Sequence, residues 1–190
     1  MLTFYLTQFV VFTVISFVLT FTTFILTDER YYGIDEDKIG GDLGRIGAYV
    51  EIVVIIEGLF MGPIFDYFGR KIPLVIGFLI TGIAVAGIPM FRSLYPAFFI
   101  LRVMLSCGSL TGLNAPLLPD YVQKESLGKA VGQVEVVINL AFIFASTGML
   151  QIASHLSDEK YIYFALGGTI IIIAFWLIFG LKDVINDPKK

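Results

Sequence analysis

The sequence predicts an all-α membrane protein with six transmembrane helices. Of its 190 residues, 57% are hydrophobic and 15% are charged, whereas about a quarter of the residues in soluble domains are charged. The charged residues are clustered, and the apolar stretches between the clusters are about 20 residues long. A helix of that length crosses the hydrocarbon core of a bilayer, which is roughly 30 Å thick. We therefore expect a lipid bilayer to surround this chain.

The first apolar stretch, at about 3–26, contains several Ser and Thr residues and ends before the charged segment Asp28-Glu29-Arg30. It has neither the basic start nor the small-residue cleavage site of a secretory signal peptide. We therefore interpret it as a first membrane helix that is retained. A loop of about 17 residues, acidic and containing glycine, is expected to follow it.

Short charged turns and prolines separate the next spans. The second span is expected at about 46–65, and the charged turn after it leads to Pro73, a residue type favoured in the first turn of a helix. Pro96 opens the fourth span in the same way. The remaining spans and the polar tail are expected at about 72–91, 96–118, 130–153, 161–181 and 182–190.

The six spans, within residues 1–181, are expected to form a single bundle of two helix triplets. Such a 3+3 inverted repeat occurs in many transporters; here it is inferred from the spacing, because the residues show no clear repeat. Lys and Arg in the connections predict that both termini lie on the cytoplasmic or equivalent side. That side holds seven of them and the other five: Arg70, Lys71, Lys124, Lys129, Lys182, Lys189 and Lys190, against Arg30, Lys38, Arg45, Arg92 and Lys160.

Composition and motifs argue against several other classes of function. The net charge is −3 and no basic face is evident, so no nucleic-acid partner is expected. The single cysteine, Cys107, has no disulfide partner in the chain, and the single histidine, His155, lies in no cluster of metal ligands. We find no nucleophile–base pattern and no phosphate-binding glycine loop, so no enzyme, metal or cofactor is predicted.

The strongest local pattern is the segment from Gly62 to Lys71. Gly62 allows a neighbouring helix to approach closely, and Asp66 offers acceptors at the membrane face to helix-end N–H groups or to an arginine. Gly69 permits a tight turn between two antiparallel helices. Arg70 and Lys71 are expected to hold this turn on the positive side of the membrane.

This segment resembles the signature loop between helices two and three of the major facilitator superfamily, which reads roughly G-x-x-x-D-x-x-G-R-K/R. All five positions match. The resemblance implies an all-helical transporter fold, with this chain similar to the N-terminal six-helix half. It also implies that Asp66 and Arg70 act in a cytoplasmic gate against the partner half and do not contact the solute.

Two further segments extend the resemblance along the chain. Arg102 to Gly112 is similar to the family's R-x-x-x-G-x-G-x-x-x-G helix, with Ser106 in place of the first glycine. In the next loop Asp120 matches an acidic gate residue of the family, but Leu127 stands where the family has arginine. The ion pair that this arginine makes in the family is therefore in question here.

Four ionisable residues fall inside the predicted spans: Glu51, Glu57, Arg102 and Glu135. Such residues are costly in hydrocarbon and are expected to face a cavity or a partner. We hypothesise that Arg102 pairs with Glu51 at matched depth, and that Glu57, near the midplane, lines the solute path or exchanges a proton. Glu135 is expected in the inner leaflet, within reach of interfacial water. The alternative is that these charges only hold helices together.

Two functions remain open at this point. The first is solute transport by alternating access, in which this chain would need a second six-helix half, a homodimer mate or another chain. The second is a non-transporting accessory subunit of a large membrane complex, for example a respiratory-chain assembly. The solute, the coupling ion and the membrane are not specified by the sequence.

Overall fold

A computed structural model describes residues 2–114, 122–156 and 158–180 of the chain. All regular elements in these ranges are helices, and they confirm the predicted all-α fold. They are α1 (Leu2–Thr27), α2 (Glu36–Phe68), α3 (Lys71–Gly87), η1 (Ile88–Met90), η2 (Leu94–Phe98), α4 (Phe99–Asn114), η3 (Lys124–Ser126), α6 (Leu127–Phe144), η4 (Ala145–Met149), α7 (Leu150–Ser154) and α8 (Lys160–Gly180).

Six of the helical segments in the described ranges are long and apolar enough to cross a membrane. Adjoining helices combine in three of them, so that η1 continues α3, η2 precedes α4, and η3, α6, η4 and α7 form one span. The six are Phe4–Thr27, Glu36–Phe68, Lys71–Met90, Leu94–Thr111, Lys124–Ser154 and Lys160–Gly180.

Helix α2 begins at Glu36, ten residues (46 − 36) before the span expected from hydropathy, so part of the expected loop is helical. This polar extension has its own local stabilisation. Glu36 and Asp37 lie in the first turn, where negative charge favours the positive end of the helix dipole. Arg45 pairs with Asp42 three residues earlier along the helix. Hydropathy could not reveal a helical segment that is this polar.

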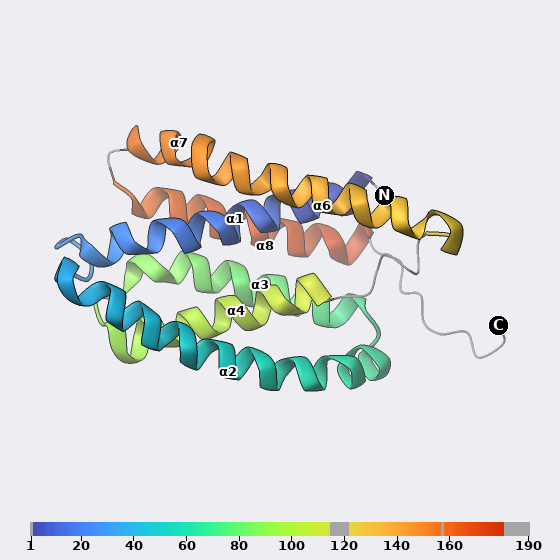
Figure 1. The fold of residues 1–190 in the computed structure, drawn as a ribbon, viewed down its shortest axis with the longest axis horizontal. Coiled ribbons are helices and arrows are strands. Elements are labelled where there is room, and N and C mark those ends of the chain that lie inside the picture. Colours follow the sequence, from blue (N-terminus) through green and yellow to red (C-terminus); the bar gives the residue numbers. More distant parts are fainter. Residues whose placement is uncertain (1, 115–121, 157, 181–190) are drawn as a thin grey trace.

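The helices lie alongside one another in a bundle (Figure 1). Helix α3 packs against α4 and α8, α1 packs against α6, and α2 packs against α4. Thus the first helix of each triplet contacts the second helix of the other triplet, and the two third helices contact each other. This pattern fits the inverted 3+3 repeat, which remains a prediction.

Glycines bring α3 close to both of its main neighbours. At the crossing with α4, a Cβ atom added to Gly108 would lie 2.5 Å from the carbonyl oxygen of Gly77. At the crossing with α8, a Cβ atom on Gly167 would lie 2.6 Å from the carbonyl oxygen of Gly82. Small residues permit such contacts in membranes, where close van der Waals packing holds helices together.

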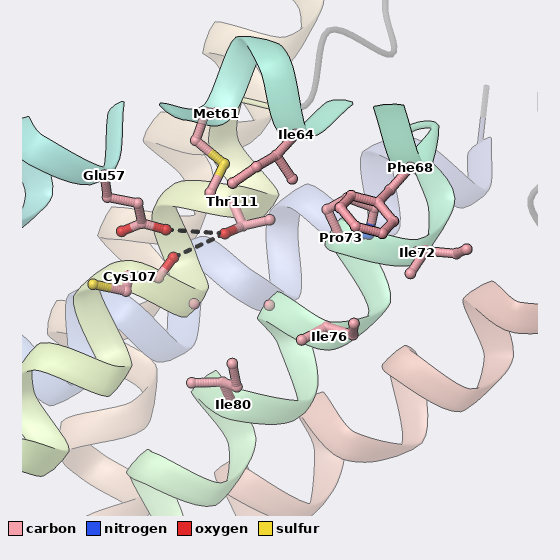
Figure 2. Close-up of a pocket in the computed structure, with 12 residues that line it drawn as sticks. Glu57, Met61, Ile64, Phe68, Ile72, Pro73, Ile76, Ile80, Cys107 and Thr111 are labelled. Carbon is pink, nitrogen blue, oxygen red and sulfur yellow. Dashed lines mark hydrogen bonds between the residues drawn. The ribbon is translucent and has the colours of Figure 1, made fainter. Parts of the chain in front are cut away.

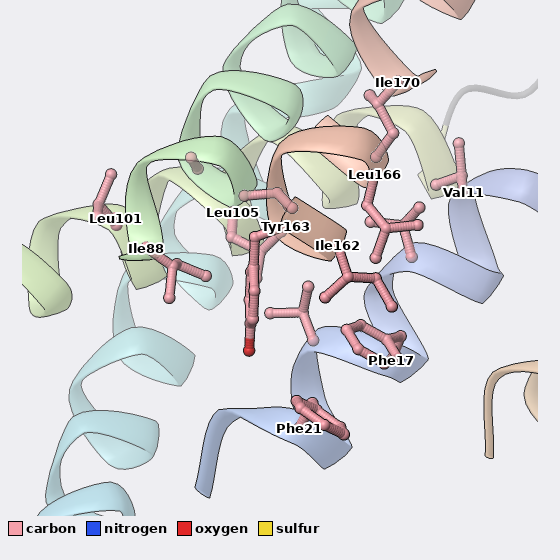
Figure 3. Close-up of a cluster of buried hydrophobic side chains, with 14 of the residues drawn as sticks. Val11, Phe17, Phe21, Ile88, Leu101, Leu105, Ile162, Tyr163, Leu166 and Ile170 are labelled. Carbon is pink, nitrogen blue, oxygen red and sulfur yellow. The ribbon is translucent and has the colours of Figure 1, made fainter. Parts of the chain in front are cut away.

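Large apolar side chains fill the space between α1, α3, α4 and α8 (Figure 3). Phe17 of α1 and Tyr163 of α8 are fully buried, and their rings meet edge to face with centroids 6.1 Å apart. Ile88 and Leu105 are buried in the same cluster. This core fixes α1 and α8 to the central helix α3.

The second and fifth spans are the least buried of the six. In the most apolar 18-residue stretch of each span, 56% of the first and 61% of the third are buried, against 17% of the second and 22% of the fifth. The second span is α2, and the fifth contains α6. Both therefore offer long apolar surfaces to lipid or to another protein unit.

The N-terminus, the turn between α2 and α3, and the start of α6 lie at one end of the bundle (Figure 1). The α1–α2 connection and the α7–α8 connection lie at the other end. Successive spans are therefore antiparallel, as the predicted topology requires. Which end faces the cytoplasm stays a prediction from the positive charges.

Candidate functional site

The turn that carries the strongest sequence pattern is short. Helix α2 ends at Phe68 and α3 begins at Lys71. Between them Gly69 has a φ of 73° and a ψ of −179°, a combination that glycine adopts because it has no Cβ atom. Asp66, in the last turn of α2, is exposed and makes no hydrogen bond or ion pair to another described residue. Arg70 and Lys71 are half-buried where α3 begins.

No described helix of this chain packs closely on Gly62. A Cβ atom added at Gly62 would meet no atom within 4 Å, and the same is true of Gly58, one helical turn earlier. The helix that was expected to approach Gly62 is not one of the described helices of this chain. Gly128 and Gly132 of the fifth span are equally open, unlike Gly108. The rotation of each helix decides this, and residue spacing does not reveal it.

Glu57 lies at one end of a cavity of about 340 Å³ between α2, α3 and α4 (Figure 2). The hydroxyl group of Thr111 is 3.3 Å from Oε1 of Glu57 and 3.0 Å from the carbonyl oxygen of Cys107, and it is positioned to donate to either. The Cys107 thiol lies beside the same carboxylate. Two residues of α4 thus lie beside the Glu57 side chain.

Within the described ranges, no cationic side chain forms an ion pair with the Glu57 carboxylate. Its Oε2 atom is buried and has no hydrogen-bond partner, and none of the ion pairs among the described residues includes Glu57. The rest of the cavity is almost wholly apolar, running along α2 and α3 toward their connecting turn (Figure 2). Its apolar side chains are those of Met61, Ile64, Phe68, Ile72, Pro73, Ile76 and Ile80.

Arg102 and Glu51 are neighbours but not a contact pair. The guanidinium of Arg102, half-buried on α4, feels the charge of the Glu51 carboxylate on α2. The two make no ion pair within 4.0 Å among the described residues. Glu51 is exposed on α2, and its attraction to Arg102 acts beyond that 4.0 Å limit. Their direct pairing remains a prediction.

The remaining candidates lie apart from the cavity. Glu135 is exposed on α6, and its backbone carbonyl accepts a hydrogen bond of 2.7 Å from the side-chain amide of Asn139. Asp120 lies outside the described residues. A separate polar contact joins α1 to α6: the Tyr5 hydroxyl donates a hydrogen bond of 2.9 Å to the side-chain oxygen of Gln133.

Sequence reasoning missed the roles of Thr111 and Cys107 beside Glu57. The sequence identifies Cys107 only as a cysteine without a disulfide partner, and no pattern in it singles out Thr111. Their spacing of four residues places both on one face of α4. The sequence can therefore show that α4 has a polar face. It does not show that this face packs against α2 and Glu57, because that depends on how the helices are paired.

A second polar cluster joins the two connections at the opposite end of the bundle. The Tyr31 hydroxyl donates to the carboxylate of Asp158, and Lys160 forms an ion pair with the same carboxylate at 2.8 Å. The pKa of Asp158 is lowered to about 2, most strongly by its hydrogen bond with the Lys160 side chain and then by its hydrogen bond with Tyr31. Burial raises the pKa of the neighbouring Glu159 above its usual value. The cluster fastens the α1–α2 connection to the start of α8.

Comparison with known families gives one match that spans the bundle. The model of the Major Facilitator Superfamily matches residues 4–190, which include all six spans. No curated protein matches the chain.

Proposed function

This chain belongs to the major facilitator superfamily, and on this basis we propose that it is one six-helix half of a solute transporter that works by alternating access. Members of the family are transporters and not enzymes. In such transporters two halves rock about a site between them. A second half is therefore required, from the same polypeptide, from another copy or from a different chain.

The observation that carries this proposal is the open surface of α2 next to the signature turn. Gly58 and Gly62 form a small-x-x-x-small pair with no atom near either position. Leu59 between them is 73% exposed, and Asp66 at the end of the helix has no partner among the described residues. A helix of a second unit packed here would use the glycines for close approach. It would also bring a partner to the gate carboxylate.

The intramembrane charges fit a role in transport. Glu57 sits where an exchange of partner or proton is possible, since one of its oxygens is unsatisfied. Glu51 and Arg102 lie near each other between α2 and α4. We assign Glu57 to solute or proton coupling, with the other two and Glu135 as candidate path residues. Replacing Glu57 by Gln should alter both the rate and the pH dependence of transport, whereas unchanged values would exclude the proton role.

The direct test measures solute uptake into liposomes that contain the chain together with its second half. A panel of sugars, organic acids and amino acids should include a solute that is taken up. Asp66→Asn should lower this uptake at least tenfold, because the gate loses its charged contact. Asp37→Asn, at the exposed opposite end of α2, is the matched control and should leave uptake unchanged.

A structural accessory role is the second candidate, favoured by one departure from the family pattern. Leu127, the first residue of α6, stands where the family's gate arginine is usual. If no solute in the panel moves, and the chain copurifies in fixed stoichiometry with a large membrane complex, this second function replaces the first.

A further inference from the structure

We propose that the cavity between α2, α3 and α4 binds a small organic cation that carries an apolar body, with the cationic group on Glu57. The site is formed within one six-helix unit (Figure 2). It therefore does not depend on which second half completes the transporter, or on whether transport occurs. The ligand class follows from the charge at one end of the cavity and from the apolar character of the rest.

The charge argument rests on the unsatisfied carboxylate. Oε2 of Glu57 is buried without a partner, and Oε1 shares the Thr111 hydroxyl with the carbonyl oxygen of Cys107. An ionised carboxylate out of water is strongly unfavourable unless a charge and a hydrogen-bond donor offset it. An ammonium group supplies both through a charge-assisted hydrogen bond. No described residue of the chain makes an ion pair with Glu57.

The shape and lining of the cavity select the rest of the ligand. A volume of about 340 Å³ lies in the range of pockets that hold small organic molecules. Ile64, Phe68 and Ile76 line it beyond the carboxylate, so an aryl or alkyl group would be removed from water there. Each buried CH₂ group contributes about 0.8 kcal/mol to such a transfer. A two-chain phospholipid is far larger than this space.

A bare metal ion does not fit the same site. Calcium and magnesium require six or more oxygen ligands, or several retained waters. The cavity offers one carboxylate, one hydroxyl group and one thiol among apolar side chains. In addition, no group of three or more His, Cys, Asp or Glu side chains in the described part of the chain is arranged to hold a metal. An organic ammonium ion, by contrast, needs only one carboxylate to pair with its charge.

Binding of 4-phenylbutylammonium to the full chain in phosphatidylcholine nanodiscs tests the proposal. Titration calorimetry, with empty nanodiscs subtracted, should show saturable binding at one site, and the uncharged analogue 4-phenylbutanol should bind at least tenfold more weakly. Glu57→Gln should weaken binding of the ammonium at least tenfold. Glu29→Gln removes an exposed carboxylate outside the helices and should leave binding unchanged.

A second variant keeps the test decisive if Glu57→Gln fails to give a monodisperse, helical protein. Ile64→Trp leaves the carboxylate in place and fills the cavity, so it should abolish saturable binding. The proposal is overturned if either variant binds the ammonium as well as the wild type does. It is also overturned if phosphatidylethanolamine in the nanodisc displaces the probe, because a lipid headgroup would then be the occupant. Absence of flux in the transport assay would leave these binding results untouched.

Discussion

Replacing Gly167 by Ala tests the crossing of α3 and α8 that centres the bundle. The new Cβ atom would lie 2.6 Å from the carbonyl oxygen of Gly82, whereas ordinary contact begins at 3.4 Å, so the helices must separate locally by 0.8 Å (3.4 − 2.6). Overpacking of this kind costs about 1–3 kcal/mol. Alanine also favours the helix by about 1 kcal/mol relative to glycine.

Gly168 provides the matched control on the same helix, because a Cβ atom there meets nothing within 4 Å. The helix preference of alanine is common to both substitutions, so Gly167→Ala should be less stable than Gly168→Ala by about 1–3 kcal/mol. At the upper end this is roughly a hundredfold in the unfolding equilibrium, since about 1.4 kcal/mol is tenfold.

The assay is reversible unfolding in mixed micelles, in which the denaturing detergent is titrated and helix content is followed by circular dichroism. The wild type should lie between the two variants or close to Gly167→Ala, and Gly168→Ala should be the most stable. Equal stability of the two alanine variants would refute the packing of Gly167 on Gly82, and with it the arrangement of the third and sixth spans around the core.

Two more predictions use the same unfolding assay. The folded-state pKa of Asp158 is lowered from 3.8 to about 2, so its contribution to stability is present above about pH 4 and is lost as the pH falls toward 2. Asp158→Asn should remove this part of the acid sensitivity, and an unchanged pH profile would show that the cluster with Tyr31 and Lys160 does not form. Gly69→Ala should destabilise the turn by about 1–3 kcal/mol, because its φ of 73° and ψ of −179° lie in a backbone region that essentially only glycine adopts; stability equal to that of the wild type would contradict the turn geometry.

Much of the fold was predictable because the bilayer sets the lengths of its helices. A span needs about 20 apolar residues, and each of the six segments of the chain that meet this requirement is helical in the described ranges. The turn at Gly69 was predictable for a similar reason, since few residues other than glycine tolerate its backbone angles. These features depend on local sequence alone.

The features that the sequence did not reveal depend on how the helices are rotated and paired. Gly62 and Gly108 look alike as small residues in apolar helices, yet one faces open space and the other packs on Gly77. Glu57 was recognised as an intramembrane charge, but its neighbour Thr111 lies 54 residues further along the chain. The polar first turns of α2 were assigned to a loop because hydropathy measures apolarity and not helix stability.

Photocrosslinking from the open surface of α2 tests the central claim most directly, namely that a second six-helix unit covers this surface. A photoreactive phenylalanine analogue would replace Leu59, which is 73% exposed on α2, or Ile172, which is 69% exposed on α8 and serves as the control. In native membranes the Leu59 position should crosslink to a second six-helix unit, identified by peptide mapping, and the Ile172 position to lipid. Crosslinks to lipid alone from Leu59, or the same products from both positions, would contradict the claim.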